Sequence, residues 1–229
     1  MIPLEHLDSA QVPGGDELRL MRRGNDFMIV LDRNELMNSR MSGSEEALAT
    51  MTVERLAGRK NQRWLIGGYG MGFTLRAALG VLGPDAKLMV VELVPKIVEW
   101  ARGPMAELTA GCLEDPRVRL VEADVALQIA RERSAWDGIL LDVDNGPDGL
   151  VRAGNDRLYN REGLAAARDA LLPGGVLAVW SASKDPVFAN RLRKAGFTVD
   201  EVQVRARSNG KGAKHTIWFA TKDAGVNRK

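Results

Sequence analysis

The sequence predicts an α/β protein with a mostly parallel sheet, preceded by a small antiparallel β region. From residue 61 onward, short apolar runs alternate with stretches of helical pattern. Continuous apolar strands between helices are typical of a parallel sheet that is buried on both faces. After the last helix, 197–205 and 215–221 form two strands with no helix between them. These observations predict a seven-stranded sheet ending in an antiparallel hairpin.

The first 60 residues predict a separate β extension followed by a helix. Alternating or apolar segments separated by turn residues indicate a hairpin and one further short strand. These strands are expected at 17–22, 27–32 and 35–40. Ser42 and Glu45 have the spacing of a capping box, so a helix is expected to begin there and to end near Ala57. We therefore expect an extension over 1–60 and a main domain over 61–229.

The main domain follows a regular strand and helix order. Strands are expected at 64–66, 88–93, 118–121, 139–141 and 176–180. Helices are expected at 73–82, 95–102, 125–133, 161–172 and 186–195. Pro95 and Pro186 stand where a proline is favoured, at the first position of a helix.

Composition excludes several classes of protein. The chain has 229 residues, 32 Lys and Arg against 30 Asp and Glu, and one cysteine. The balanced charge predicts no nucleic-acid partner, and a single cysteine excludes a disulfide scaffold. Two distant histidines predict no metal site, and no apolar run reaches the ~20 residues of a membrane span. The N-terminus lacks a signal sequence, so a cytoplasmic protein is expected.

A glycine-rich loop follows the first strand of the main domain. Gly67, Gly68, Gly70 and Gly72 fall within six residues, between that strand and a helix. Such glycines allow tight turns and let a ligand approach the backbone amides. Glu92 ends the next strand, twenty residues beyond Gly72, where an acid can accept both hydroxyls of a ribose.

The spacing of the glycines favours one class of nucleoside. Gly68, Gly70 and Gly72 form G-x-G-x-G, the usual form in proteins that bind S-adenosylmethionine, and not the G-x-G-x-x-G of dehydrogenases. The third strand leads into Asp124 and Val125, where an acid commonly meets the adenine amino group. The cofactor is therefore expected to be S-adenosylmethionine or its decarboxylated form.

The fourth strand carries the candidate catalytic residues. Asp142 ends this strand and Asp144 follows it, so both are expected at the edge of the sheet where ligands bind. A carboxylate there could orient an attacking amine or hydroxyl and take its proton. Asp144 and Asn145 could equally form a simple turn, and a Mg²⁺ site is the less favoured alternative. Tyr159, after a long polar loop, could close the active site.

The stretch from Arg63 to Trp180 resembles the spermidine synthase family within the class I methyltransferase fold. The similar segments are LIGGYGMG, VVELVPKIV, VRLVEADV, GILLDVDNGP and LYNREGLAAARDALLPGGVLAV. The resemblance implies a Rossmann-like sheet, ribose binding by Glu92, adenine binding by Asp124 and a catalytic role for Asp142. It also implies a polyamine as the acceptor of an aminopropyl group.

Departures from the family's pattern bear on the group transferred. The family's glycine loop carries an aspartate that holds the aminopropyl amine, and here Tyr69, Gly70 and Met71 supply no acid. The sequence therefore favours methyl transfer from S-adenosylmethionine to an amine or hydroxyl of a small molecule. Aminopropyl transfer from decarboxylated S-adenosylmethionine is the first alternative, and a non-catalytic nucleoside-binding protein is the second.

Some residues are expected to have structural roles. His215 is expected to pack in the core, and Cys112 to be inert. The basic residues of 205–214 are expected to be solvated and not to bind phosphate. Exposed strand edges in the extension could pair between two copies, so a homodimer is possible.

Overall fold

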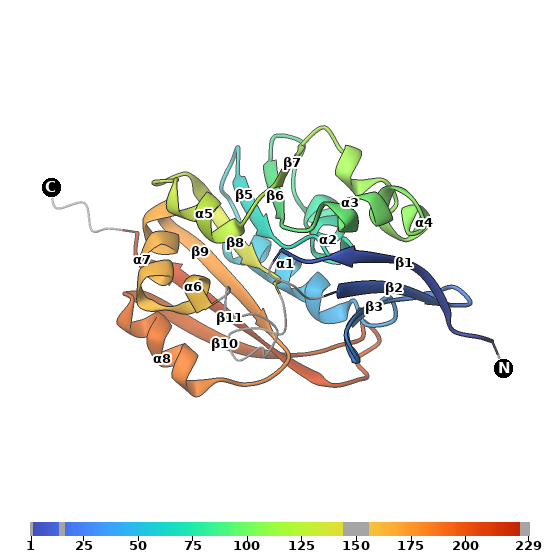
Figure 1. The fold of residues 1–229 in the computed structure, drawn as a ribbon. Helices are drawn as coiled ribbons and strands as arrows, with labels where there is room; N and C mark the ends of the chain where they lie inside the picture. Colours follow the sequence, from blue (N-terminus) through green and yellow to red (C-terminus); the bar gives the residue numbers. More distant parts are fainter. Residues whose placement is uncertain (1, 14–16, 144–155, 225–229) are drawn as a thin grey trace, which may run out of the picture.

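The computed structural model describes residues 2–13, 17–143 and 156–224, and it contains two sheets (Figure 1). The smaller sheet is antiparallel, in the order β1-β2-β3-β4. Its strands are β1 (Glu5–Gln11), β2 (Glu17–Arg23), β3 (Asp26–Leu31) and β4 (Asn34–Asn38).

The larger sheet has seven strands in the order β10-β11-β9-β8-β5-β6-β7. These strands are β5 (Arg63–Gly67), β6 (Lys87–Glu92), β7 (Val118–Glu122), β8 (Trp136–Leu141), β9 (Leu171–Ser181), β10 (Phe197–Arg205) and β11 (Lys214–Lys222). The pairs among β5 to β9 are parallel, and β11 is antiparallel to both of its neighbours. This confirms the predicted sheet with its antiparallel C-terminal hairpin.

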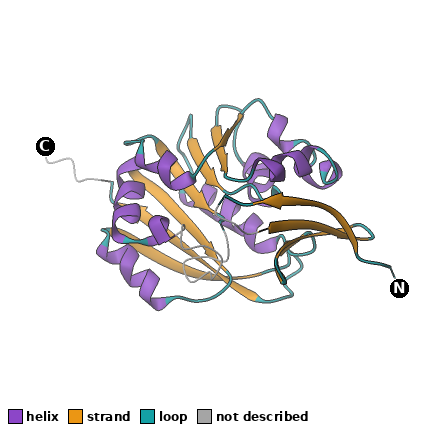
Figure 2. Cartoon of the chain, viewed as in Figure 1, coloured by secondary structure: helices purple, strands orange, loops and turns teal. Residues whose placement is uncertain are grey.

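Helices cover both faces of the larger sheet (Figure 2). They are α1 (Gly43–Arg55), α2 (Phe73–Val81), α3 (Pro95–Arg102), α4 (Ala106–Thr109), α5 (Val125–Ala130), α6 (Asp156–Tyr159), α7 (Arg161–Ala170) and α8 (Pro186–Lys194), with a 3₁₀ turn η1 (Cys112–Glu114). Consecutive strand residues point to opposite faces. Leu65 thus packs in the cluster of α5 to α8, and Ile66 in the cluster of α1 to α3.

The N-terminal sheet shares a core with the main sheet. Leu20 and Ile29 belong to the same buried cluster as Leu48 of α1 and Trp64 of β5. The Gly43 N–H donates to the Ala206 carbonyl at 2.9 Å, which ties the start of α1 to the end of β10. The division into 1–60 and 61–229 stays a prediction. So does a homodimer, for which β1 and β4 provide the edge strands.

Two local expectations were wrong. Residues 5–11 form a strand that the sequence did not predict, because only Ala10 in it is buried and no apolar alternation marks it. The capping box does not form, since the Ser42 side chain makes no capping hydrogen bond and Ser42 is already near helical dihedrals. Glu45 is instead bonded to the Ser44 hydroxyl.

Some boundaries also differ. Helix α7 ends at Ala170, and β9 begins at Leu171, where the sequence predicted helix to Leu172. Pro173 and two glycines follow Leu172, so extended backbone is favoured there. Within the described residues, no helix is both long and apolar enough to cross a membrane.

Candidate functional site

A cavity lies between the N-terminal sheet and the ends of β5, β6, β7 and β8. Apolar residues of the N-terminal region form one wall: Val12, Leu18, Ile29, Leu31, Leu36 and Met37. The opposite wall comes from the strand ends and from the loops and helix starts that follow them: Gly68, Gly70, Val91, Glu92, Leu93, Val94, Ile97, Ala123, Asp124, Val125, Asp142 and Val143. In an open α/β sheet, ligands bind at this carboxyl edge of the strands.

The glycine loop needs a glycine at residue 68. Gly68 has φ +85°, and a Cβ there would lie 2.4 Å from the Asp142 carbonyl oxygen. Both the left-handed backbone and the close approach exclude a larger residue. Gly67 packs against Val125, the first residue of α5, where an added Cβ would lie 2.8 Å from Val125 Cγ2. The loop therefore keeps its backbone close to Asp142, at the end of β8.

The two non-glycine residues of the loop, Tyr69 and Met71, are buried and are not among the described residues that line the cavity. Tyr69 is buried, and its hydroxyl lies 3.3 Å from Cys112 Sγ. Burial raises the pKa of both Tyr69 and Cys112, so both groups stay neutral. Gly72, the last glycine of the loop, has φ +78° and is the N-cap of α2, and a Cβ there would lie 2.8 Å from the Tyr69 hydroxyl oxygen.

Glu92 ends β6 and lines the cavity with only 5% of its surface exposed. Its Oε2 accepts from the Tyr69 N–H and its Oε1 from the Val94 N–H, each at 2.8 Å. Burial raises the pKa of Glu92, and these backbone donors oppose the rise. The backbone N–H groups of Leu93 and Gly70 also lower its pKa, so a ribose hydroxyl that binds Glu92 would share the carboxylate oxygens with backbone donors.

Asp124 has a structural role beside its predicted one. It is the N-cap of α5, and its Oδ1 accepts from the Ala126 N–H at 2.8 Å. Its Oδ2 accepts from Arg157 at 3.0 Å, in an ion pair at the exposed rim of the cavity. An adenine amino group that binds Asp124 must therefore share or displace the Arg157 contact.

Asp142 follows β8 and is held by a buried threonine. The Thr74 hydroxyl donates to Asp142 Oδ2 at 2.6 Å. Burial raises the pKa of Asp142 to about 6, and the Thr74 hydrogen bond opposes the rise. Asp142 thus lies beside the glycine loop and is largely ionised at neutral pH.

The structure brings together the glycine loop, Glu92, Asp124, Val125 and Asp142. Asp144 lies outside the described residues, so its catalytic role stays a prediction. Tyr159 is buried in α6 with its ring edge-on to Phe188 at 5.5 Å, and it is not among the described residues that line the cavity. Its predicted role in closing the site has no support from this position.

Sequence reasoning missed two polar residues beside Asp142. Thr74 is the second residue of α2, and nothing in its local sequence distinguishes it. Glu45 lies near the start of α1, and its spacing from Ser42 suggested a helix cap. Its pKa is raised to about 8 by burial and by the nearby Asp142 carboxylate. Only the tertiary arrangement reveals this pair of acids.

No protein-family model matches the chain. Two curated relatives are polyamine aminopropyltransferases. The one from Mycobacterium tuberculosis (strain CDC 1551 / Oshkosh) is 29% identical over 203 residues, which cover 85% of this chain and 37% of the relative. Polyamine aminopropyltransferase 1 from Streptomyces coelicolor is 32% identical over 156 residues, covering 64% and 28%. The chain thus spans about a third of the length of these relatives.

Solved structures show the same fold. Spermidine synthase from Thermotoga maritima superimposes with a TM-score of 0.75 and 21% identity, over 97% of this chain and 74% of that one. A spermidine synthase in complex with the transition-state analogue AdoDATO gives a TM-score of 0.77 with the same identity and coverage. The chain is therefore similar in sequence to polyamine aminopropyltransferases, and it has the fold of these spermidine synthase structures.

Proposed function

We propose that this chain is an enzyme that transfers an aminopropyl group from decarboxylated S-adenosylmethionine to a small-molecule amine. The observation that carries the proposal is the arrangement of Gly68, Glu92 and Asp142 around one cavity. The curated relatives named as polyamine aminopropyltransferases support it, and they support aminopropyl transfer better than the methyl transfer favoured by the sequence.

The residues present fit an adenosine-type sulfonium cofactor. Gly68 lines the cavity, and its lack of a Cβ lets the loop backbone pass close to the Asp142 carbonyl oxygen, which an added Cβ would meet at 2.4 Å. Glu92 offers acceptors for a ribose, and Asp124 can accept from an adenine amino group through Oδ2. The apolar wall of the N-terminal sheet, including Leu31 and Met37, would cover the uncharged parts of the ligand. When bound, the cofactor supplies an alkyl carbon made electrophilic by its sulfonium, with a neutral thioether as leaving group.

The chain's own residues would position the nucleophile and take its proton. Asp142 is ionised at neutral pH and can accept the proton that the attacking amine loses. Thr74 fixes the Asp142 carboxylate, so that its other oxygen can face the amine. Glu92 and Asp124 would hold the nucleoside and so align the reacting carbon with the amine. Alignment of this kind contributes much of the rate in a displacement reaction.

One observation favours methyl transfer as a second candidate. Gly70 brings no acid to the cavity, and a Cβ there would lie 3.0 Å from Met37 Sδ. Met37 therefore fills the space that a side chain at residue 70 would need. The described part of the loop offers no carboxylate to a primary ammonium of the cofactor, which weakens the case for the decarboxylated form.

A product assay separates these functions. The purified chain is incubated with S-adenosylmethionine or its decarboxylated form, together with putrescine or a monoamine. Aminopropyl transfer releases 5′-methylthioadenosine, and methyl transfer releases S-adenosylhomocysteine. We expect methylthioadenosine from the decarboxylated form only.

The variant Asp142→Asn provides the control for chemistry. It is expected to bind methylthioadenosine with native affinity, measured by calorimetry, and to lose at least tenfold in turnover. Release of S-adenosylhomocysteine alone would replace the proposal by methyl transfer. Nucleoside binding without either product would leave a non-catalytic nucleoside-binding protein.

A further inference from the structure

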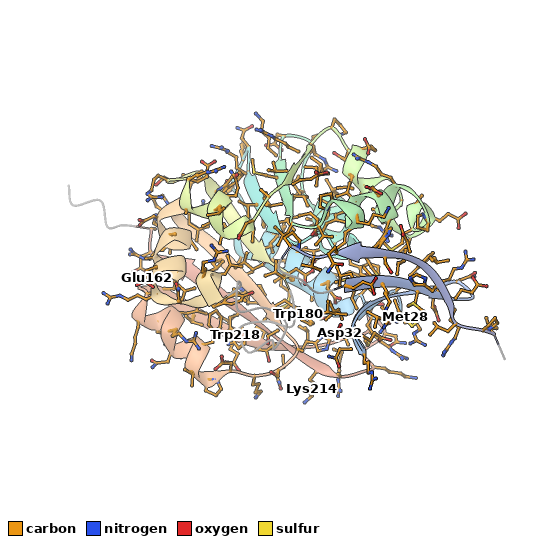
Figure 3. The ribbon with its side chains drawn as sticks, viewed as in Figure 1. Met28, Asp32, Glu162, Trp180, Lys214 and Trp218 are labelled. Carbon is orange, nitrogen blue, oxygen red and sulfur yellow. The ribbon has the colours of Figure 1, made fainter. Side chains whose placement is uncertain are left out.

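A line of polar side chains runs from β11 across the start of α1 toward Asp142. His215 Nδ1 lies 2.8 Å from Ser44 Oγ, and the Ser44 hydroxyl donates to Glu45 Oε2 at 2.6 Å. Ser44 is fully buried. His215 is half-buried, and its ring lies edge-on to the Trp180 ring with 4.8 Å between the ring centres. Figure 3 labels Trp180 and also Lys214, which precedes His215 in the sequence. The four side chains in contact come from three elements that are far apart in sequence: α1, β9 and β11.

Thr74 joins this line to the candidate catalytic acid. Its hydroxyl oxygen lies 2.6 Å from Asp142 Oδ2 and 3.5 Å from the Glu45 backbone oxygen. Thr74 thus contacts the carboxylate of Asp142 and the backbone of Glu45 in a largely buried place. The Asp142 charge also raises the pKa of the Glu45 carboxyl, so the two carboxyl groups interact. Two interacting buried carboxyl groups do not both ionise readily, so one of them keeps a proton near neutral pH. The pKa of about 8 for Glu45, against about 6 for Asp142, indicates that Glu45 keeps it.

The charged and titratable groups around Glu45 are few among the described residues. Asp142 faces it from the end of β8, and Glu46 adds a smaller repulsion from α1. His215 reaches it from β11 through Ser44, and burial lowers the pKa of His215, so that its ring is neutral at pH 7. Since Ser44 donates to Glu45, the neutral His215 ring donates to Ser44 from Nδ1.

We propose that Glu45 is a positioning residue for a cationic acceptor, and this rests on the proposed transfer to an amine. The protonation of Glu45 determines the net negative charge that the Glu45–Asp142 pair presents to that acceptor. With Glu45 protonated the pair carries one negative charge, and with Glu45 ionised it carries two. Ser44 and His215 hold the Glu45 carboxyl in place. The more highly charged pair binds an ammonium group more tightly, because opposite charges attract strongly where water is largely excluded.

The kinetic test measures KM for an amine acceptor between pH 7 and pH 9. An amine with a pKa near 10 stays charged over this range. For the native chain, KM is expected to fall about fivefold as Glu45 ionises, the size of one modest ion pair. Glu45→Gln cannot gain that charge, so its KM should not fall. Glu54→Gln, on an exposed face of the same helix, should keep the native fall. An equal fall in all three proteins would overturn the proposal.

A stability measurement tests the proton on Glu45 without any turnover. The folded pKa of Glu45 is raised from 4.5 to about 8, so its protonation contributes stability below pH 4.5 that is lost as pH rises through 8. The thermal midpoint of the native chain should therefore fall by roughly 5 °C more between pH 6 and pH 9 than that of Glu45→Gln. Equal falls in the two proteins would mean that Glu45 holds no extra proton, and the inference would be wrong.

The two measurements separate failure of this inference from failure of the proposed function. A larger thermal fall in the native chain, with no product from any amine, would overturn the proposed transfer and with it the positioning role. Turnover with no difference in thermal fall would overturn the inference alone.

A second variant tests the part played by Ser44. Its hydrogen bond lowers the pKa of Glu45, so Ser44→Ala should move the change in KM about one unit toward higher pH. Ser44→Thr keeps the hydroxyl and should restore the native midpoint. A midpoint that does not move in Ser44→Ala would overturn the role of Ser44.

Discussion

The Thr74 hydroxyl donates a 2.6 Å hydrogen bond to Asp142, and this contact joins helix α2 to the end of strand β8. The bond stabilises the ionised carboxylate and lowers the pKa of Asp142, against the effect of burial. The protonation of the candidate base therefore depends on a residue outside the loop that carries it.

Replacing this threonine should shift the pH dependence of turnover. In Thr74→Val the pKa of Asp142 is expected to rise from about 6 by roughly one unit, because a hydrogen bond to a charged group is lost. At pH 6.5, kcat/KM should fall about threefold, and at pH 8.5 it should be near native. Thr52→Val removes another buried hydroxyl, one that bonds the Leu48 carbonyl, and should leave the pH profile unchanged. An unmoved acid limb in Thr74→Val would argue against Asp142 as the base.

Gly68 has two features that exclude a side chain, its left-handed backbone and its closeness to the Asp142 carbonyl oxygen, and a second glycine allows their effects to be measured apart. Gly68 and Gly58 have φ of +85° and +86°, and only Gly68 has backbone within reach of an added Cβ. Gly58→Ala should therefore cost about 1 kcal/mol in the free energy of unfolding, from the left-handed backbone alone. Gly68→Ala should cost more and also weaken nucleoside binding at least tenfold. Urea unfolding and calorimetry measure the two effects. Equal costs and equal affinities would mean that the loop tolerates a side chain.

Glu92 is expected to be sensitive even to an isosteric change. In Glu92→Gln, the side-chain amide would place N–H donors against the backbone N–H of Tyr69 or Val94. The free energy of unfolding should fall by about 1–3 kcal/mol, and methylthioadenosine should bind at least tenfold more weakly. Glu122, the partner of Glu92 in the register of β6 and β7, is exposed and provides the control. Glu122→Gln should change neither quantity, and native affinity in Glu92→Gln would exclude a ribose contact.

Asp124 allows its two roles to be tested apart. Serine is as good an N-cap as aspartate, so Asp124→Ser should keep the capping of α5, whereas Asp124→Ala should lose about 1 kcal/mol of stability. Both variants lack the acceptor for an adenine amino group, and both should bind methylthioadenosine more weakly by about fivefold or more. A serine variant with native affinity would assign Asp124 to helix capping alone.

The parallel sheet could be predicted from sequence because its strands are continuous apolar runs between helices. The runs ending in Gly67, Glu92 and Leu141 are buried on both faces, so no other element fits them. The carboxyl ends of parallel strands lie at one edge, so Glu92, Asp124 and Asp142 could also be grouped without a structure.

The pair of acids could not be predicted in the same way. The strands β5 to β8 lie between Glu45 and Asp142 in the sequence. The position of Glu45 follows from the packing of α1 against α2 and the strands. The spacing of Ser42 and Glu45 predicted a capping box that does not form. The orientation of α1 about its own axis, which depends on tertiary packing, decides which of its side chains are buried. Strand β1 was missed for a related reason, since it pairs through its backbone and buries little.

The hydrogen bond between Ser44 and His215 links residues 171 positions apart. Strand β11, the last in the chain, lies between β9 and β10 in the sheet. It supplies His215, which is hydrogen-bonded to Ser44 and through it to Glu45. During synthesis at the usual ~5–20 residues per second, Glu45 and Asp142 would both emerge many seconds before that histidine. The described residues that line the cavity end at Val143, so all of them are synthesised before the histidine that supports the carboxyl at residue 45. The order of translation thus becomes the order in which the residues of the site are supplied.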